Sequence, residues 1–135
     1  EKDAEVFEPL SKAYSLPKNT EEEKAQRNEI MESALKAASQ VPLDIMKKSL
    51  EAIELHEELS VKGTKMAISD VGVGVAFCKS ALLGASLNVF INTKLMKDRE
   101  YAEKLNRETE DMIVRGTEKA DKIYNAIEAQ LKTRG

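Results

Sequence analysis

The sequence predicts an all-α fold, a multi-helix bundle built around a buried central helix. Apolar residues recur every three or four positions nearly throughout, while the strand-like alternation of apolar and polar residues is hard to find. Only six glycines and three prolines interrupt the 135 residues. Between Val71 and Thr93 the only charged residue is Lys79. A helix that is apolar on every side needs protein on every side, so we expect this one at the centre of the bundle.

The composition favours one soluble globular domain over residues 1–135, with 41% hydrophobic and 33% charged residues. The 21 basic and 24 acidic residues are interleaved and leave no basic stripe, so we expect no nucleic-acid partner. The single cysteine, Cys78, cannot form an internal disulfide and lies in the apolar run. Its apolar neighbours indicate a buried thiol, and the lack of an internal disulfide favours a reducing compartment. We therefore expect a cytoplasmic protein.

The first half of the chain predicts two helices. Residues 3–16 form the first, with a bend expected at Pro9. Thr20, followed by Glu23 three residues later, is a capping box that begins the second helix. Pro42 lacks an amide proton and should break or kink this helix, which then continues towards Gly63.

The apolar run forms the third helix, for which Ser69, followed by Asp70, is the predicted N-cap. A run of this length would nearly span a bilayer. Its glycines, serines and other polar residues make it poor for lipid, and we expect no membrane span. A ridge of small residues winds round the helix and would let other helices approach closely: Gly72, Ala76, Ser80 and Gly84. Near its end, Asn88 and Asn92 should find hydrogen-bond partners or line a wet cleft, because an unpaired buried amide costs about 1–3 kcal/mol.

The last helix begins after Asp98, as its cap, and runs to about Lys132. Its buried face falls at helical period on these residues: Tyr101, Leu105, Met112, Gly116, Ala120, Ile123, Ile127 and Leu131. At 1.5 Å per residue it would be about 50 Å long. Such a helix overhangs a small domain or packs against a partner subunit, and this favours a homodimer.

Four motifs in this order carry a resemblance over almost the whole chain: "SLPKNTEEEKAQRNE", "AASQVPLDIM", "ISDVGVGVAF" and "GASLNVFINTKLMKD". The chain resembles the cyclodeaminase/cyclohydrolase family, which includes the cyclodeaminase part of formiminotransferase-cyclodeaminase and free-standing methenyltetrahydrofolate cyclohydrolases. The resemblance implies a helical bundle with a buried central helix and an intertwined homodimer. Members carry a further segment ahead of this one, with a Gly-Gly-Gly-Ser turn, so we expect the domain to be N-terminally incomplete.

The resemblance also implies an activity in folate one-carbon metabolism. The protein would be a 5-formiminotetrahydrofolate cyclodeaminase, a 5,10-methenyltetrahydrofolate cyclohydrolase, or both, with a tetrahydrofolate derivative as its substrate and no metal or tightly bound cofactor. The segment "DAEVF" matches the family pattern around the catalytic aspartate and gives that role to Asp3. A carboxyl that accepts one proton and delivers another needs a pKa nearer neutrality than that of free aspartate.

Six further residues are candidates for substrate binding, and each has a simpler structural interpretation. Lys18 and Arg27 would bind the anionic tail of folate, or would be solvated charges. Ser69 and Asp70 would face the substrate at the mouth of the central helix, where a helix N-terminus suits a carboxylate, or would only cap the helix. Asn88 and Asn92 would contact the pterin, or would only form hydrogen bonds between helices.

Two further residues need an interpretation, and one alternative function stays open. Lys79 is interpreted as a side chain whose charge reaches water at the edge of the bundle. His56 is expected at the surface, because the di-metal helix motif needs Glu at position 53 and the residue there is Ile. The alternative function is a non-catalytic helical module whose small-residue ridge and long last helix build an assembly.

Overall fold

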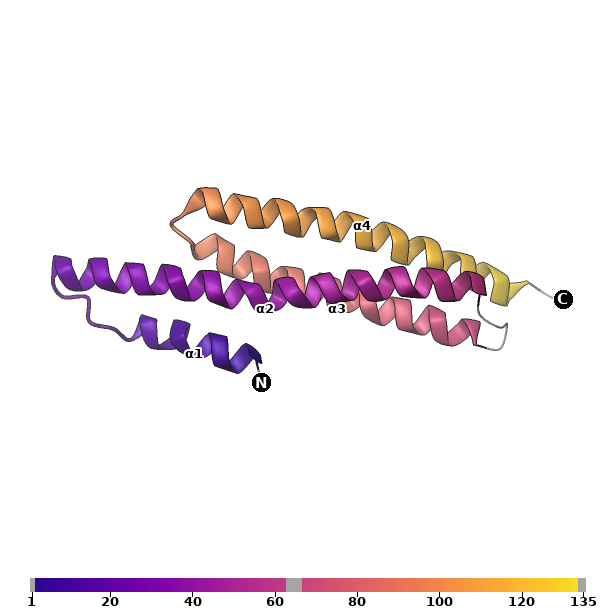
Figure 1. Cartoon of the computed structure of the whole chain (residues 1–135), viewed down its shortest axis with the longest axis horizontal. Coiled ribbons are helices and arrows are strands. Elements are labelled where there is room, and N and C mark those ends of the chain that lie inside the picture. The colour runs from indigo at the N-terminus through magenta and orange to yellow at the C-terminus, as the bar shows by residue number, and fades with distance from the viewer. Residues whose placement is uncertain (1, 63–66, 134–135) are drawn as a thin grey trace.

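The structure is a computed structural model that describes residues 2–62 and 67–133, with side chains for 8–61 and 67–133. It contains four helices: α1 (Lys2–Tyr14), α2 (Glu21–Lys62), α3 (Ile68–Leu95) and α4 (Arg99–Lys132). No strand occurs among these residues. The all-α bundle predicted from the sequence is therefore confirmed (Figure 1).

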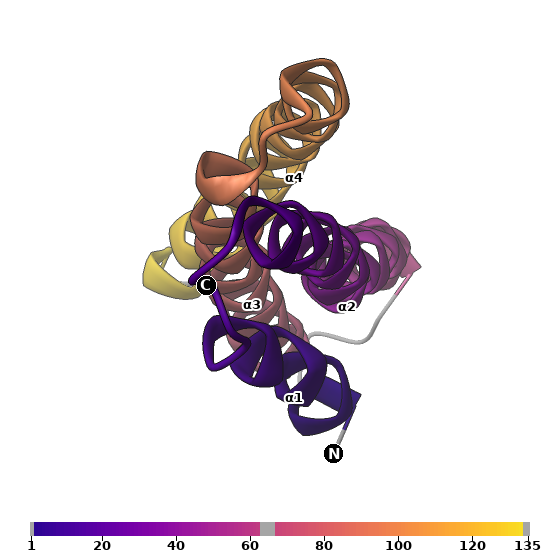
Figure 2. The same ribbon diagram turned by 90° about the vertical axis from the view of Figure 1, so that its left-hand side faces the viewer.

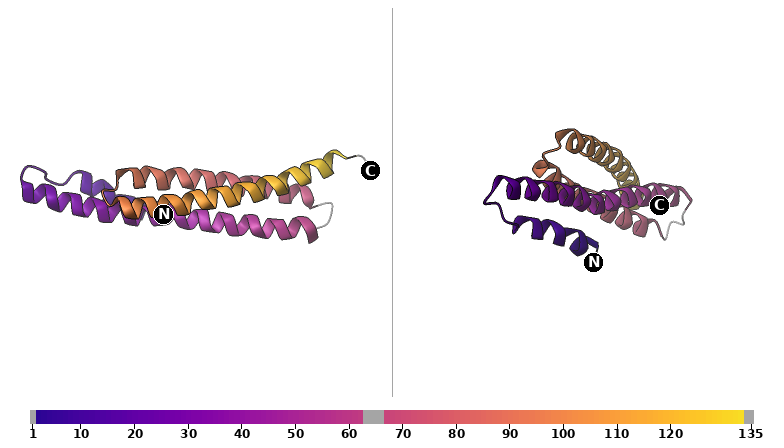
Figure 3. Two further views of the ribbon diagram at one scale, coloured as in Figure 1. Left: turned by 90° about the horizontal axis from the view of Figure 1, so that it is seen from above. Right: turned by 60° about the vertical axis from the view of Figure 1, so that its left-hand side comes forward.

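The bundle is elongated, with α2, α3 and α4 running lengthwise beside one another (Figure 1; Figure 3). Helix α2 contacts all three other helices, and α3 and α4 also contact each other. Within the described ranges, helix α1 contacts only α2 and turns back along its first half (Figure 1). Seen end-on, α1 and α4 lie on opposite sides of the bundle (Figure 2).

Two of the three predicted helix caps are confirmed. The backbone N–H of Glu23 donates to Thr20 Oγ1 at 3.1 Å, and that of Tyr101 donates to Asp98 Oδ1 at 3.1 Å. The cap predicted at Ser69 is wrong, because α3 already begins at Ile68 and its N-cap is Ala67, which makes no side-chain hydrogen bond. Ser69 and Asp70 therefore belong to the first helical turn, where a negative charge still faces the positive end of the helix dipole.

Of the break or kink predicted at Pro42, the break does not occur, since α2 runs without interruption from Glu21 to Lys62. A proline inside a helix costs about 3 kcal/mol. Here the apolar side chains on both sides of it are buried in one interface, among them Leu35, Leu43 and Met46. Burial of each such side chain contributes about 1.5–3 kcal/mol, so packing outweighs the lost hydrogen bond.

The predicted buried face of α4 is largely confirmed. Six of the residues predicted for it are buried: Leu105, Met112, Gly116, Ala120, Ile123 and Ile127. Tyr101 is half-buried and packs against the core. Leu131 is exposed, and its predicted burial is wrong; it lies one turn beyond Ile127, whose side chain covers Gly72 of α3.

Helix α3 is covered on one face only, which differs from the expected protein on every side. The face towards α2 and α4 contains fully buried side chains such as Val75, Leu82 and Val89. Its other face leaves Phe77 and Leu87 exposed. Among the described residues, α3 is also the one helix long and apolar enough to cross a membrane, by length and composition only. Of its most apolar window 28% is buried, and the buried residues belong to the core of the bundle.

Candidate functional site

The turn between α3 and α4 is fixed to the first half of α2 by charged side chains. The Glu32 carboxylate accepts hydrogen bonds from the backbone N–H groups of Lys97, at 2.7 Å, and Asp98, at 3.3 Å. Lys36 donates to the Asp98 carboxylate at 2.8 Å, and its ammonium group lies 4.6 Å from the centre of the Tyr101 ring. The C-terminal end of α3 and the N-terminal half of α2 therefore share one end of the bundle.

This cluster shifts two pKa values. The hydrogen bond from Lys36, assisted by that from the Tyr101 N–H, lowers the pKa of Asp98 below its ordinary value of 3.8. The hydrogen bond to Asp98 raises the pKa of Lys36 above 10.5. The contacts join residues more than sixty positions apart, which is why local sequence patterns did not find them.

Arg27 lies at the same end of the bundle and is half-buried in the second turn of α2. One of its terminal nitrogens donates to the backbone carbonyl of Tyr14 at 3.5 Å, which ties the end of α1 to α2. Its Nε atom is buried and has no hydrogen-bond partner among the residues whose side chains are described. Lys18 is exposed in the connection between α1 and α2. Two basic groups thus lie near the turn where α1 meets α2, and a guanidinium with a remaining donor suits a carboxylate.

The two asparagines also lie towards this end, on the last turns of α3. Asn92 is half-buried and Asn88 is exposed. The sequence predicts that both amides find hydrogen-bond partners or line a wet cleft, and at Asn88 water can satisfy the amide. Ser69 and Asp70 are exposed at the opposite end of α3. Eighteen residues separate Asp70 from Asn88, or about 27 Å of helix. One copy of the chain does not bring these two groups together.

Asp3 belongs to α1, but its side chain lies outside the described residues. The structure therefore places the helix that carries it without testing its catalytic role. Among the described residues α1 contacts α2 and not α4, so the helix that carries Asp3 lies on the side of the bundle away from α4 (Figure 2).

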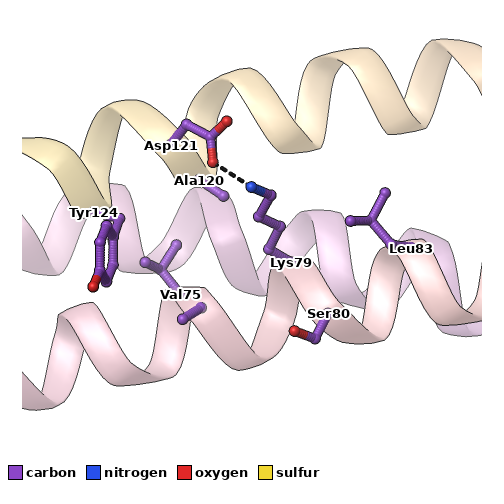
Figure 4. A pocket seen from close by; sticks show the side chains of 8 residues that line it. Val75, Lys79, Ser80, Leu83, Ala120, Asp121 and Tyr124 are labelled. Carbon is purple, nitrogen blue, oxygen red and sulfur yellow. Dashed lines mark hydrogen bonds and ion pairs between the residues drawn. The ribbon is translucent and has the colours of Figure 1, made fainter.

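A cleft of about 400 Å³ opens between α3 and α4 (Figure 4). Its apolar lining comes from Val75, Ala76, Leu83 and Ala120. Lys79 donates to the Asp121 carboxylate at 2.6 Å across it, and the Tyr124 ring and the Ser80 hydroxyl complete the wall. Lys79 does lie at the bundle edge, as expected, but its acidic partner on α4 was not foreseen.

A second cleft of about 390 Å³ lies between α2 and α4 and is mostly charged. Glu54 accepts from Lys119 at 3.3 Å and lies 3.8 Å from Arg115 at its wall. Of the predicted site residues, the six whose side chains the structure describes line neither cleft. Their assignment as site residues stays a prediction.

His56 is not a surface residue, contrary to the prediction. It is half-buried, its Nδ1 atom lies 2.6 Å from the carbonyl oxygen of Ala52, and its ring fills the space beside Gly74 of α3. The glycine makes room for the ring, a relation that no local pattern encodes. Among the residues that the structure describes, no group of three or more His, Cys, Asp or Glu side chains could hold a metal ion.

The fold defines a class, that of long-helix bundles in which one apolar helix packs against amphipathic ones. Residues 1–111 match the family model for formiminotransferase-cyclodeaminase, and the chain belongs to this family. The resemblance seen in the four motifs is thereby confirmed.

The relatives agree with this family. The chain is 38% identical to a methenyltetrahydrofolate cyclohydrolase of Methylorubrum extorquens over 129 residues, which cover 96% of the chain and 62% of that protein. It is 33% identical to the formimidoyltransferase-cyclodeaminase of Gallus gallus, over 98% of the chain and 24% of that protein. The chain thus spans less than two thirds of the length of these relatives.

A solved structure has a similar fold. The crystal structure of formiminotetrahydrofolate cyclodeaminase from Thermotoga maritima superposes with a TM-score of 0.70 and 29% sequence identity. The match covers 93% of this chain and 60% of that one. The arrangement of the four helices is therefore shared with a cyclodeaminase.

Proposed function

We propose that the protein is an enzyme of folate one-carbon chemistry, which acts on 5,10-methenyltetrahydrofolate as a cyclohydrolase or on 5-formiminotetrahydrofolate as a cyclodeaminase. The observation that carries the proposal is the 38% identity to a methenyltetrahydrofolate cyclohydrolase along 96% of the chain. The cyclodeaminase name of the structural neighbour supports the second substrate.

Both reactions need one group that moves protons at the bridging carbon. In cyclodeamination, N10 attacks the formimino carbon, loses its proton, and the C–N bond to the former imino nitrogen breaks as that nitrogen leaves as ammonia. In cyclohydrolysis, water adds to the methenyl carbon, the bond from that carbon to N5 breaks, and 10-formyltetrahydrofolate results. We assign the proton transfer to the carboxyl group of Asp3, which would serve as base and then as acid.

The substrate would be held at its anionic tail and at its pterin ring. Lys18 and Arg27 supply positive charge near the end of α1, the helix that carries Asp3, and suit the glutamate carboxylates of the tail. Asn88 and Asn92 offer amide groups for the pterin. Ser69 and Asp70 lie in the first turn of α3, where the helix N-terminus suits a carboxylate of the substrate. We propose these six as binding residues, with no metal and no tightly bound cofactor.

An absorbance assay that follows the methenyl chromophore tests the activity with both substrates. Replacing Asp3→Asn should lower the rate by about 100-fold or more, because general acid–base catalysis contributes about 10²–10⁴-fold. Glu8→Gln, an exposed change on the same helix, is the matched control and should leave the rate unchanged. Equal rates for Asp3→Asn and the parent chain would remove Asp3 from the mechanism. A complete absence of turnover with either substrate would favour the helical-module alternative.

We also propose that the enzyme is a cytoplasmic homodimer with no nucleic-acid or membrane partner. The free thiol of Cys78 supports a reducing compartment, and the exposed apolar face of α3 supports self-association.

A further inference from the structure

Helix α2 keeps a proline, Pro42, in its interior. Proline has no backbone N–H, so the hydrogen bond that residue 42 would donate to the carbonyl oxygen of Ala38, four residues earlier, cannot form. The proline ring also crowds this carbonyl group. The Ala38 carbonyl therefore keeps a hydrogen-bonding capacity that an ordinary helix would use within its own backbone.

The side chains next to this carbonyl bond to other groups. The Ser39 hydroxyl donates to the carbonyl of Leu35 at 2.9 Å. The Gln40 amide donates to the Tyr101 hydroxyl at 3.3 Å. None of the side chains that the structure describes donates to the Ala38 carbonyl, and Ala38 is only 8% exposed. A buried carbonyl without a donor destabilises a fold, so a donor from a ligand would be favoured at this point.

Ala38 lies on the strip of α2 that borders both α1 and α3. Eleven residues before it, Arg27 donates to the Tyr14 carbonyl of α1 at 3.5 Å. Eighteen residues after it, His56 fills the space beside Gly74 of α3. At about 100° per residue, eleven residues make three turns plus about 20°, and eighteen make five full turns. Ala38 therefore points in nearly the same direction as the residues that contact α1 and α3.

Asn92 of α3 lies at the level of Ala38. Helices α2 and α3 run in opposite directions (Figure 1), and the contact of His56 with Gly74 fixes their register. Ala38 is eighteen residues before His56, and Asn92 is eighteen residues after Gly74. Both are therefore about 27 Å from that contact along the bundle, and five full turns keep Asn92 on the face of α3 that meets α2.

A second contact between the two helices gives the same level. The backbone N–H of Lys97, just past the end of α3, donates to the Glu32 carboxylate at 2.7 Å. Asn92 is five residues before Lys97, and Ala37 is five residues after Glu32. The half-buried amide of Asn92 thus lies beside the turn of α2 that carries the freed carbonyl.

The backbone of α1 brings Asp3 to this level too. Helix α1 runs antiparallel to the first half of α2 (Figure 1), and the contact of Arg27 with Tyr14 fixes where they meet. Asp3 is eleven residues before Tyr14, and Ala38 is eleven residues after Arg27. Each is therefore about 16.5 Å from that contact along the bundle. Three helices place a polar group at one cross-section of the molecule.

We propose that the Ala38 carbonyl and the Asn92 amide together hold the edge of the pterin that carries a ring N–H next to a ring carbonyl. The ring N–H would donate to Ala38, and the ring carbonyl would accept from Asn92. An acceptor and a donor side by side on the protein match a donor and an acceptor side by side on the ligand. This contact rests on the proposed folate substrate and makes a main-chain group of α2 part of its recognition.

Pro42→Ala tests the contact, because alanine supplies an N–H that can bond to Ala38 within the helix. Calorimetric titration with tetrahydrofolate, a probe that does not react, should give a dissociation constant about three- to tenfold higher than that of the parent chain. In the free variant, the new amide at position 42 should be protected from hydrogen exchange, as expected when the carbonyl is engaged.

Pro9→Ala is the matched control, since Pro9 also lies inside a helix but is exposed on α1. It should leave the dissociation constant unchanged. Pro42 is buried, so Pro42→Ala also removes ring carbons from the core. Pro42→Val fills that space and likewise supplies an N–H, and it should weaken binding as much as Pro42→Ala does.

A direct readout is the NMR resonance of the Ala38 carbonyl carbon in protein labelled with carbon-13. It should shift when the parent chain is saturated with tetrahydrofolate, because the carbonyl then accepts a hydrogen bond. In Pro42→Val it should already be shifted without the ligand. A packing role for Pro42 alone would change the free energy of unfolding but would not produce the ligand-dependent shift.

Two outcomes would overturn the contact while the folate proposal stands. One is an equal dissociation constant for the parent chain, Pro42→Ala and Pro42→Val. The other is an Ala38 carbonyl resonance that does not move in a parent chain saturated with tetrahydrofolate. A parent chain that does not bind tetrahydrofolate at millimolar concentration would overturn the folate proposal and this contact together.

Discussion

The ammonium group of Lys36 on α2 lies 2.8 Å from the carboxylate of Asp98, the cap residue of α4. One carboxylate thus holds the start of α4 and fixes α4 to α2 at the same time. Both partners are partly exposed, so the pair contributes orientation more than stability.

The pH dependence of this pair is expected to appear at both extremes. The folded pKa of Asp98 is lowered, so its stabilisation is fully present above the ordinary value of 3.8 and is lost as the pH falls through the folded pKa. The folded pKa of Lys36 is raised, so its share is complete below 10.5 and is lost as the pH rises through the folded pKa. The pair stabilises the fold between these limits.

The measurement is urea unfolding of Asp98→Asn against the parent chain from pH 2 to pH 8. Asparagine still caps a helix, so only the charge is removed. The parent chain should unfold at higher urea at pH 7, and the difference should shrink below pH 4. A constant difference across this range would show that the charge is not responsible. Asp44→Asn, an exposed change elsewhere on α2, should match the parent chain.

Burial raises the pKa of the Cys78 thiol above its ordinary value of 9.0. The thiolate is the reactive form, so modification by a disulfide reagent at pH 7.5 should be slower than for the chain unfolded in urea. The native rate should rise steeply as the pH passes 9.0. Equal native and unfolded rates at pH 7.5 would contradict the half-buried position of this side chain.

Ile53 is fully buried between α2 and its neighbours, and Ile53→Ala should lower the free energy of unfolding by about 2–5 kcal/mol. Val61, near the end of the same helix, is 81% exposed, and Val61→Ala should change it by less than about 0.5 kcal/mol. Chemical denaturation of both variants checks the pair. Similar losses for the two would mean that the core does not lie where α2 meets α3 and α4.

Arg27 is expected to bind the anionic tail of the substrate. Arg27→Gln should raise the KM for a folate substrate about 10-fold to 100-fold with little change in kcat, because a hydrogen bond to a charged group contributes about 1.5–3 kcal/mol. Lys24→Gln, an exposed change three residues before Arg27 on α2, is the control and should leave the KM unchanged. A fall in kcat alone would indicate a role in α1 docking through Tyr14 instead.

Local patterns predicted the helices well because capping and periodicity are local properties. Thr20 and Asp98 begin α2 and α4 where expected, and Met112 and Ile123 lie on the predicted buried face. A break or kink at Pro42 is predicted from one lost hydrogen bond, but the helix does not break there, because long-range packing on both sides of Pro42 holds it together. Propensity is readily overridden by such burial.

The candidate site was less predictable, since it depends on which helix faces which. His56 is covered because Gly74, eighteen positions later, leaves space for its ring. Composition could show that α3 is apolar all round, but not that α2 and α4 would cover only Val75 and its neighbours. Residue type gives the chemistry of a group, whereas its surroundings come from topology.

The attachment of α1 has a consequence for dynamics. In the part of the chain that the structure describes, α1 contacts only α2, so it can separate from the bundle without disturbing the contacts among α2, α3 and α4. Its backbone amides should therefore exchange with deuterium well before those of α3, as a local unfolding unit of its own. Asp3, the proposed proton-transfer group, therefore lies on the helix with the fewest neighbouring helices. A substrate that holds α1 against the bundle would slow the deuterium exchange of the α1 amides.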